Sequence, residues 1–239
     1  MSSKATPPQP RNKPLKRPTQ ARAKVTVQAI FDTYVRIWQR DGWERVTTRA
    51  VALEAGVAVG TLYDYFPSKQ ALHSGYVRHC IERLLAAVQV QAVEPAGLSW
   101  QARVTRLVHL LGGVAEEAAW FHPQMLELEP VIAEAKHQQR AYNELLQAWR
   151  RVLEAASDLP AMPSDAQLEA LHLMVWGARR YALLVELPPQ RLQAVVAARV
   201  RAACPTTRSP AFVRMVPRAF RSAPRMARST PHAAAPKRP

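Results

Sequence analysis

The chain has 239 residues, of which 48% are hydrophobic, and a formal net charge of +15. This composition allows one sizeable domain, or a small domain joined to a larger one, and the charge suggests a polyanionic partner. It argues against a membrane protein and against a disulfide-stabilised one, because no apolar run approaches the roughly 20 residues of a membrane span and the only two cysteines are far apart.

The excess positive charge lies at the two ends of the chain. Residues 1–24 hold seven Lys/Arg and residues 201–239 hold nine, and neither stretch contains an acid. Both are rich in proline, so residues 1–20 and 204–239 are predicted to be disordered basic arms. The C-terminal arm either contacts anions non-specifically or is disordered without a role. The N-terminus lacks the apolar core of a signal peptide, so a cytoplasmic, nucleoid-associated location is expected.

Nearly all of the chain between the arms has the pattern of helices, which predicts an all-α fold. The first helix is expected over residues 21–40, where apolar side chains recur every three or four positions, and Gly42 is a natural stop. Thr47 is a predicted N-cap for a second helix, which Gly56 ends. A third, short helix is expected over residues 59–66.

Ser68 is placed to cap a long fourth helix that extends to about Val93. Beyond it the helical pattern is broken mainly at prolines. Gly112 and Gly113 indicate either a kink beside a pocket or a close helix crossing. The later helices are expected over residues 98–119, 122–133, 135–157, 165–186 and 189–203, and the last two, joined by "ELPP", should form an antiparallel hairpin.

The first three helices carry the signal for function. They lie within about 45 residues, and the tight turn "AGVA" joins the second to the third, which predicts a helix-turn-helix. Small residues at the start of the third helix suit a major groove about 12 Å wide, and hydroxyl and cationic side chains beside it can donate to phosphate oxygens. The residues assigned to DNA contact are Thr47, Thr48, Arg49, Val59, Gly60, Thr61, Tyr63, Tyr65 and Lys69.

The segment from about Ala23 to Leu84, with "TTRAVALEAGVAVGTLYDYFPSKQAL" at its centre, resembles the DNA-binding domain of TetR-family transcriptional repressors. The resemblance covers about a quarter of the chain residue by residue. It implies a homodimer that binds a palindromic operator in double-stranded DNA. It also implies that a second, all-helical domain dimerises and binds an effector, which releases the DNA.

Two positions depart from the family pattern. Ala58 replaces the frequent Ser or Thr cap of the recognition helix, at a cost of roughly 1 kcal/mol of capping. Asp64 puts an acid beside the tyrosines that face phosphate. It either accepts a hydrogen bond from a cytosine amine or points at Arg49 or Arg45, and the sequence leaves both open.

The predicted organisation is a helix-turn-helix DNA-binding domain at residues 21–67 and an all-helical effector-binding and dimerisation domain at residues 68–203. A small hydrophobic effector is expected among aromatic and methionine side chains, although such a stripe is as often plain core. The pocket residues are Trp100, Trp120, Phe121, Met125, Tyr142 and Trp149. The dimer interface is expected from the last hairpin, at Leu171, Val175, Ala178, Ala182, Val185, Leu192, Val195 and Val196.

Motifs for catalysis are absent from the sequence. There is no GxSxG, Walker or CxxC pattern, and His109, His122 and His137 form no i, i+4 pair suited to zinc. No enzyme activity, metal or cofactor is therefore expected. The predicted function is an effector-responsive repressor. The alternative is an architectural DNA-binding protein that its basic arms hold on DNA without an effector.

Overall fold

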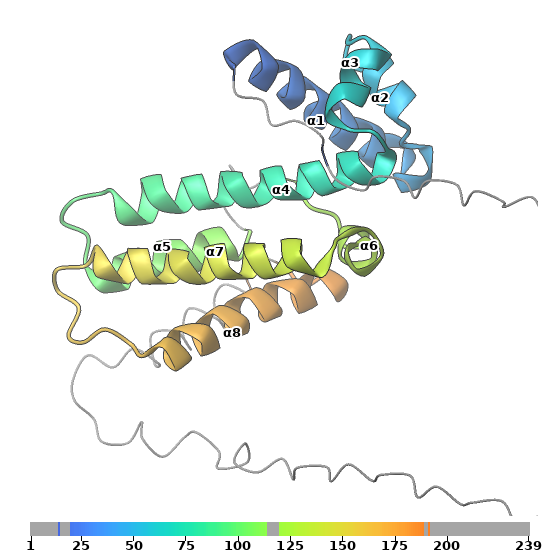
Figure 1. Cartoon of the computed structure of the whole chain (residues 1–239). Helices are drawn as coiled ribbons and strands as arrows, with labels where there is room; N and C mark the ends of the chain where they lie inside the picture. The colour runs from blue at the N-terminus through green and yellow to red at the C-terminus, as the bar shows by residue number, and fades with distance from the viewer. Residues whose placement is uncertain (1–13, 15–19, 114–119, 189–190, 192–239) are drawn as a thin grey trace, which may run out of the picture. The chain divides into compact units, whose positions relative to one another are not determined.

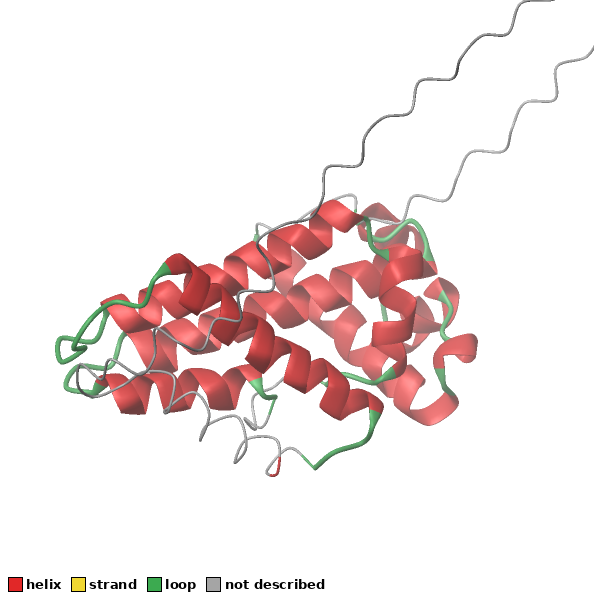
Figure 2. Ribbon diagram, turned by 90° about the horizontal axis from the view of Figure 1, so that it is seen from below, coloured by secondary structure: helices red, strands yellow, loops and turns green. Residues whose placement is uncertain are grey.

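The computed structural model describes residue 14, residues 20–113, residues 120–188 and residue 191. Within that part of the chain all regular structure is helical, as Figures 1 and 2 show. The α-helices are α1 (Ala21–Asp41), α2 (Thr48–Glu54), α3 (Val59–Tyr65), α4 (Lys69–Val88), α5 (Trp100–Leu111), α6 (Gln124–Ile132), α7 (Ala135–Glu154) and α8 (Asp165–Leu184). A 3-10 turn, η1 (Trp43–Arg45), follows α1, and a π-helical turn, η2 (Gln89–Val93), extends α4. The all-α prediction is thus confirmed.

Local interactions of single residues determine both ends of α2 and the start of α3. The Thr47 side chain accepts a hydrogen bond from the backbone amide of Ala50 and so caps α2. At the other end of α2, the amide of Val57 bonds to the carbonyl of Ala52, and Gly56 adopts a positive φ of 68°. This left-handed glycine closes α2 and turns the chain into α3.

The N-terminal core is built mainly from the apolar face of α1. Ile30, Tyr34 and Ile37 are fully or almost fully buried there, and Leu62 of α3 packs into the same cluster. Two later elements contribute as well, since α6 supplies Met125 and Ile132, and α4 supplies Leu72 and Tyr76. The three-helix unit therefore folds against α4 and α6 rather than alone.

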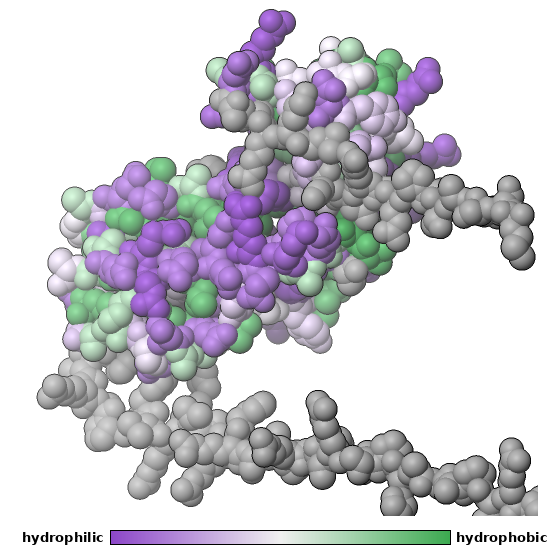
Figure 3. Space-filling model, viewed as in Figure 1, coloured by the Kyte–Doolittle hydropathy of each residue, from purple (hydrophilic) through white to green (hydrophobic). Residues whose placement is uncertain are grey.

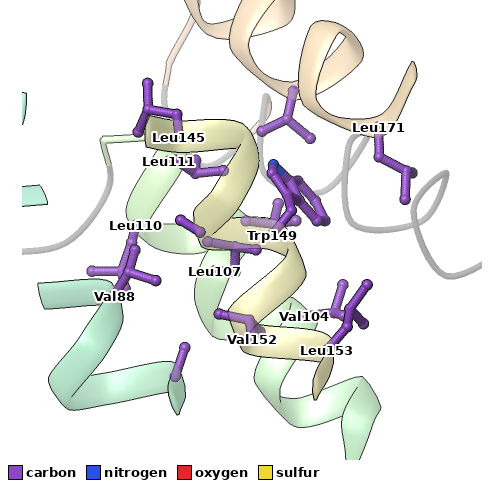
Figure 4. Close-up of a cluster of buried hydrophobic side chains, with 14 of the residues drawn as sticks. Val88, Val104, Leu107, Leu110, Leu111, Leu145, Trp149, Val152, Leu153 and Leu171 are labelled. Carbon is purple, nitrogen blue, oxygen red and sulfur yellow. The ribbon is translucent and has the colours of Figure 1, made fainter. Parts of the chain in front are cut away.

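A second core is formed by α4, α5, α7 and α8. Trp149 of α7 lies at its centre with no exposed surface, and side chains such as Leu107 and Leu171 surround it (Figure 4). Ile81 and Val88 of α4 belong to this second core, whereas the start of α4 belongs to the first. The helix α4 thus contributes side chains to both cores. A displacement of α4 at one core would therefore be transmitted to the other.

The largest difference from the sequence-based helices is in α5. A helix was predicted over residues 98–119, but α5 ends at Leu111, and Gly113 has a φ of 74°. The glycine pair is a helix stop, because a positive φ is open to glycine and strained for other residues. The predicted helix at residues 189–203 and the two predicted arms lie outside the described residues, apart from Pro14, Gln20 and Arg191.

Candidate nucleic-acid interface

The surface around α2 and α3 carries the residues that the sequence assigns to DNA. Tyr63 leaves 44% of its surface exposed, and Arg49 and Gly60 are exposed as well. A Cβ added to Gly60 would meet nothing within 4 Å, so the N-terminal turn of α3 is open toward solvent. Val59 and Thr61 are partly buried beside it. An open, small-residue turn of this kind can approach the floor of a major groove.

One hydrogen bond joins the two helices at this surface. The hydroxyl of Thr48 donates to the hydroxyl of Tyr63 at 3.1 Å. Because the Tyr63 oxygen accepts this bond, its own proton remains free to be donated outward. Thr48 was predicted to contact DNA directly, and the structure gives it the further task of orienting Tyr63. The sequence could not show this bond, since the two residues are 15 positions apart.

Lys69 has a more structural setting than expected. Its ammonium donates to the Trp43 carbonyl at 2.6 Å and lies 3.9 Å from the centroid of the Trp43 ring. Burial lowers the pKa of Lys69 below its ordinary value. The contact ties the start of α4 to η1. One of the three ammonium protons is thereby used, and the other two remain for a phosphate.

Tyr65 is partly buried. Its ring centroid lies 6.2 Å from that of Phe66, and it packs against the N-terminal core. The Thr47 hydroxyl oxygen accepts the hydrogen bond that caps α2. Its hydroxyl proton is still available to be donated to a phosphate. The nine predicted residues therefore differ in setting. Arg49, Gly60 and Tyr63 are exposed on the surface, whereas Tyr65 and Lys69 are anchored.

The six predicted pocket residues are not brought together in one cavity. Trp100 and Trp149 are buried in the second core. Trp120 and Met125 pack in the N-terminal core, where the Trp120 carbonyl accepts a hydrogen bond from the Tyr76 hydroxyl at 2.6 Å. Phe121 and Tyr142 line two different cavities.

Those two cavities adjoin each other beside α4. The larger, of about 920 Å³, is bounded by α1, α4, α6, α7 and α8. The smaller, of about 60 Å³, lies between α4, α5, α6 and α8. The side chains common to both linings are Val77, Ile81, Glu129, Trp176 and Arg180. Space for a ligand therefore exists, but on the α6 side of α4 rather than around Trp149.

The predicted interface residues are also divided by the structure. Leu171, Val175 and Ala182 face inward and are buried in the chain's own second core. Ala178 is partly buried, and Val185 is half exposed. Leu192, Val195 and Val196 lie outside the described residues. The sequence assigned Leu171, Val175 and Ala182 to the dimer interface because apolar residues occur on both sides of α8, and the buried side could not be told from the exposed one. Those exposed on it include Leu173, Tyr181, Leu184 and Val185.

Residues 30–74 match the family model described as bacterial regulatory proteins, tetR family. Over 40 residues the chain is 58% identical to the HTH-type transcriptional repressor KstR of Mycolicibacterium smegmatis. This segment of the chain, residues 30–74, belongs to the TetR family of bacterial regulatory proteins. The match to KstR covers 17% of this chain and 20% of the relative, so the chain aligns with only about a fifth of that protein's length.

Solved structures of TetR-family proteins share the fold over a longer stretch. A TetR-family transcriptional regulator from Streptomyces coelicolor has a TM-score of 0.54 at 18% identity, covering 75% of this chain and 95% of that one. SmeT, the repressor of the Stenotrophomonas maltophilia multidrug efflux pump SmeDEF, also gives 0.54 at 18% identity, covering 74% and 89%. At this identity the likeness establishes the fold.

The match to this family bears on one of the broader expectations. The family consists of regulatory proteins and not of enzymes, in line with the sequence-based exclusion of an enzyme. No helix in the described ranges is both long and apolar enough for a membrane span.

The face crossed by α4 and α7 is largely hydrophilic (Figure 3). The cytoplasmic location and the four-part domain division stay predictions.

Proposed function

We propose that this TetR-family protein is a transcriptional repressor that binds a palindromic operator as a homodimer and is released by a small effector. The observation that carries the DNA-binding proposal is the open α2–α3 surface, where Thr48 orients the exposed hydroxyl of Tyr63. A contact of this type positions the protein on the phosphate backbone, while the first turn of α3 reads bases.

Selection of bound duplexes from a random library should yield the operator. A competition assay then separates the repressor from the architectural alternative. The repressor should prefer its operator over random DNA by at least about a thousandfold. An architectural protein, held mainly by the basic arms, should show little preference, and that result would exclude the proposed function.

Tyr63→Phe and Thr61→Val should weaken DNA binding in different ways. Tyr63→Phe removes one hydroxyl that donates to phosphate, so affinity should fall by roughly 1–2 kcal/mol on operator and random DNA alike. Thr61→Val removes a donor near the groove floor, so a loss of roughly 1–3 kcal/mol should appear on the operator alone. Both variants are measured on both duplexes at one salt concentration.

The matched control for Tyr63→Phe is Tyr181→Phe, because Tyr181 is a more exposed tyrosine, at 68%, on α8. This control should bind DNA as the wild type does. Wild-type affinity in Tyr63→Phe would remove Tyr63 from the interface, and a uniform loss in Thr61→Val would make Thr61 a backbone contact.

The dimer is proposed to form through the outward side of α8. Leu173, Tyr181 and Leu184 are each more than half exposed, and their spacing places them along one side of the helix. A Cβ added to Gly177, between them, would meet nothing within 4 Å, which leaves room for a close approach of a second helix. A second copy of this face across a two-fold axis would bury these side chains.

The double variant Leu173→Glu/Tyr181→Glu should therefore be monomeric in sedimentation and lose operator affinity. Val131→Glu is the control, because Val131 of α6 is an even more exposed apolar residue, at 78%. Ala182 is unsuitable for this test, since a glutamate there would enter the chain's own core. A double variant that sediments as an unchanged dimer would place the interface elsewhere.

The effector role is supported by the larger cavity. Its lining includes Val27 and Phe31 of α1 as well as residues of α6, α7 and α8. A ligand there would contact both cores at once, and α4 passes through both. In a dimer, a change in the tilt of α4 would alter the separation of the two recognition helices, which operator binding fixes near about 34–36 Å. Among the structural relatives, SmeT has been solved as a complex with triclosan.

A further inference from the structure

Arg179 of α8 has an unusual environment. Its Nη1 donates to the Leu111 carbonyl at 3.1 Å, at the end of α5. The guanidinium carbon lies 5.1 Å from the centroid of the Trp176 ring and 6.0 Å from that of Phe121. No carboxylate within the described ranges forms an ion pair with it. The next residue, Arg180, contrasts with this, because its Nη1 lies 2.6 Å from Glu129.

The cation is also partly buried. It lines the smaller cavity, whose walls include the apolar Leu84, Leu110 and Leu126 as well as the charged Arg83, Glu129 and Arg180. Burial lowers the pKa of Arg179 below its ordinary value. Removing a charge from water is unfavourable unless a partner charge or a full set of hydrogen bonds compensates. Among the described residues, one carbonyl and two aromatic faces compensate only in part, because a guanidinium has five donors.

The dimensions of the two cavities indicate what can complete the site. About 60 Å³ is room for a few water-sized groups at roughly 10–15 Å³ each, which suits a carboxylate but not a chain of carbons. The adjoining cavity of about 920 Å³ is large enough for the body of a drug-sized ligand. The passage between them is bordered by the apolar side chains of Val77, Ile81 and Trp176 and by the Glu129–Arg180 ion pair.

We infer that Arg179 recognises the anionic head of an amphipathic ligand, and that the apolar body of this ligand extends past Trp176 into the larger cavity. The inference rests on the effector part of the proposed function and replaces a purely hydrophobic effector by a monocarboxylate with an apolar chain. The competing explanation is that Arg179 only caps α5, since a cation near the last carbonyls of a helix is favourable in itself.

Three probes separate head from tail in binding to the full chain. Decanoate carries both, 1-decanol carries the tail without the charge, and acetate carries the head alone. Calorimetry should show decanoate binding at least about tenfold tighter than decanol, since hydrogen bonds to a charged group are among the stronger ones. Acetate should bind far more weakly than either. Equal affinities for decanoate and decanol would overturn the inference.

Substitutions at Arg179 then test whether this residue causes the preference for decanoate over decanol. Arg179→Met keeps the length of the side chain but should reduce the decanoate preference to about one, while Arg179→Lys should retain it. The matched control is Arg106→Met, because Arg106 of α5 also donates Nη1 to a backbone carbonyl, that of Gln91, yet lines neither cavity. Its preference should be that of the wild type. An Arg179→Met variant that keeps the wild-type preference would overturn the inference. If Arg179→Met does not fold, Arg179→Gln replaces it in the same test, with the same overturning result.

DNA release distinguishes failure of this inference from failure of the proposed function. If decanoate binds with the expected dependence on Arg179 but leaves operator affinity unchanged, the anion site is supported and the effector role fails. If decanol releases the operator as well as decanoate does, the effector role stands and the role of Arg179 is refuted.

Discussion

Replacing Trp149 with alanine should lower the free energy of unfolding by about 3–5 kcal/mol, the range for truncating a fully buried large aromatic. Trp149 has no exposed surface and lies where α5, α7 and α8 meet (Figure 4). Truncation removes its apolar burial and leaves a cavity that neighbours such as Leu107 and Val152 can fill only in part. Urea unfolding followed by circular dichroism measures the change.

Trp149→Phe is the matched control. The indole Nε1 has no hydrogen-bond partner within the described residues, so phenylalanine loses volume but no bond. Its cost should be well below that of alanine. A Trp149→Ala variant that keeps the wild-type stability but loses affinity for the effector would contradict this. It would show that Trp149 lines the ligand pocket, as the sequence predicted.

Helix ends were predictable wherever a single residue determines them. Thr47 and Ser68 cap α2 and α4 as expected, and both caps act within three residues. Gly113 was harder, because a glycine inside a helical pattern is compatible with a kink, a crossing or a stop. Only its positive φ decides between them.

The buried side of a helix could not be read from apolar content alone. Leu171 and Leu173 of α8 are both leucines two positions apart, yet one is buried in the core and the other is half exposed. Which of them faces inward depends on how α5 and α7 pack against α8, and that is a tertiary fact. The same reason separates Trp149 and Tyr142, which the sequence placed in one pocket.

The candidate DNA surface was accessible from the sequence because its residues are contiguous and their chemistry is local. The bonds that hold it were not accessible. Thr48 reaches Tyr63 across the turn, and Lys69 reaches the carbonyl of Trp43, which precedes it by 26 positions. Arg179 gave no signal at all, because the lack of a carboxylate partner for it among the described residues can be recognised only once its neighbours are known.

Lowering the pH should destabilise the protein through His73. Its imidazole is 2% exposed among the rings of Trp38 and Trp43, and its Nδ1 shares a hydrogen bond of 2.8 Å with the Tyr34 hydroxyl. Its Nε2 has no hydrogen-bond partner in the part of the chain that the structure describes. Burial lowers the pKa of His73 from 6.5 to about 4, since the charged form would lose its hydration without gaining a counterion.

The sign of the effect follows from proton uptake. Between pH 6.5 and about pH 4 the unfolded chain binds a proton at this position and the folded chain does not, so stability decreases as the pH falls through that window. Above it the contribution is fully present. A shift of this size corresponds to roughly 3 kcal/mol at 1.36 kcal/mol per pKa unit. Because His73 joins α1 to α4, the N-terminal core should loosen first.

Urea unfolding at a series of pH values tests this expectation. His73→Asn keeps a polar group close to the Tyr34 hydroxyl but cannot take up a proton, so its stability should depend less steeply on pH over the same window. Some dependence should remain, because burial also lowers the pKa values of His79 and His172. His137→Gln, at an exposed position of α7, should leave the slope of the wild type unchanged. A wild-type slope in His73→Asn would mean that His73 does not govern the acid sensitivity of the contact between α1 and α4.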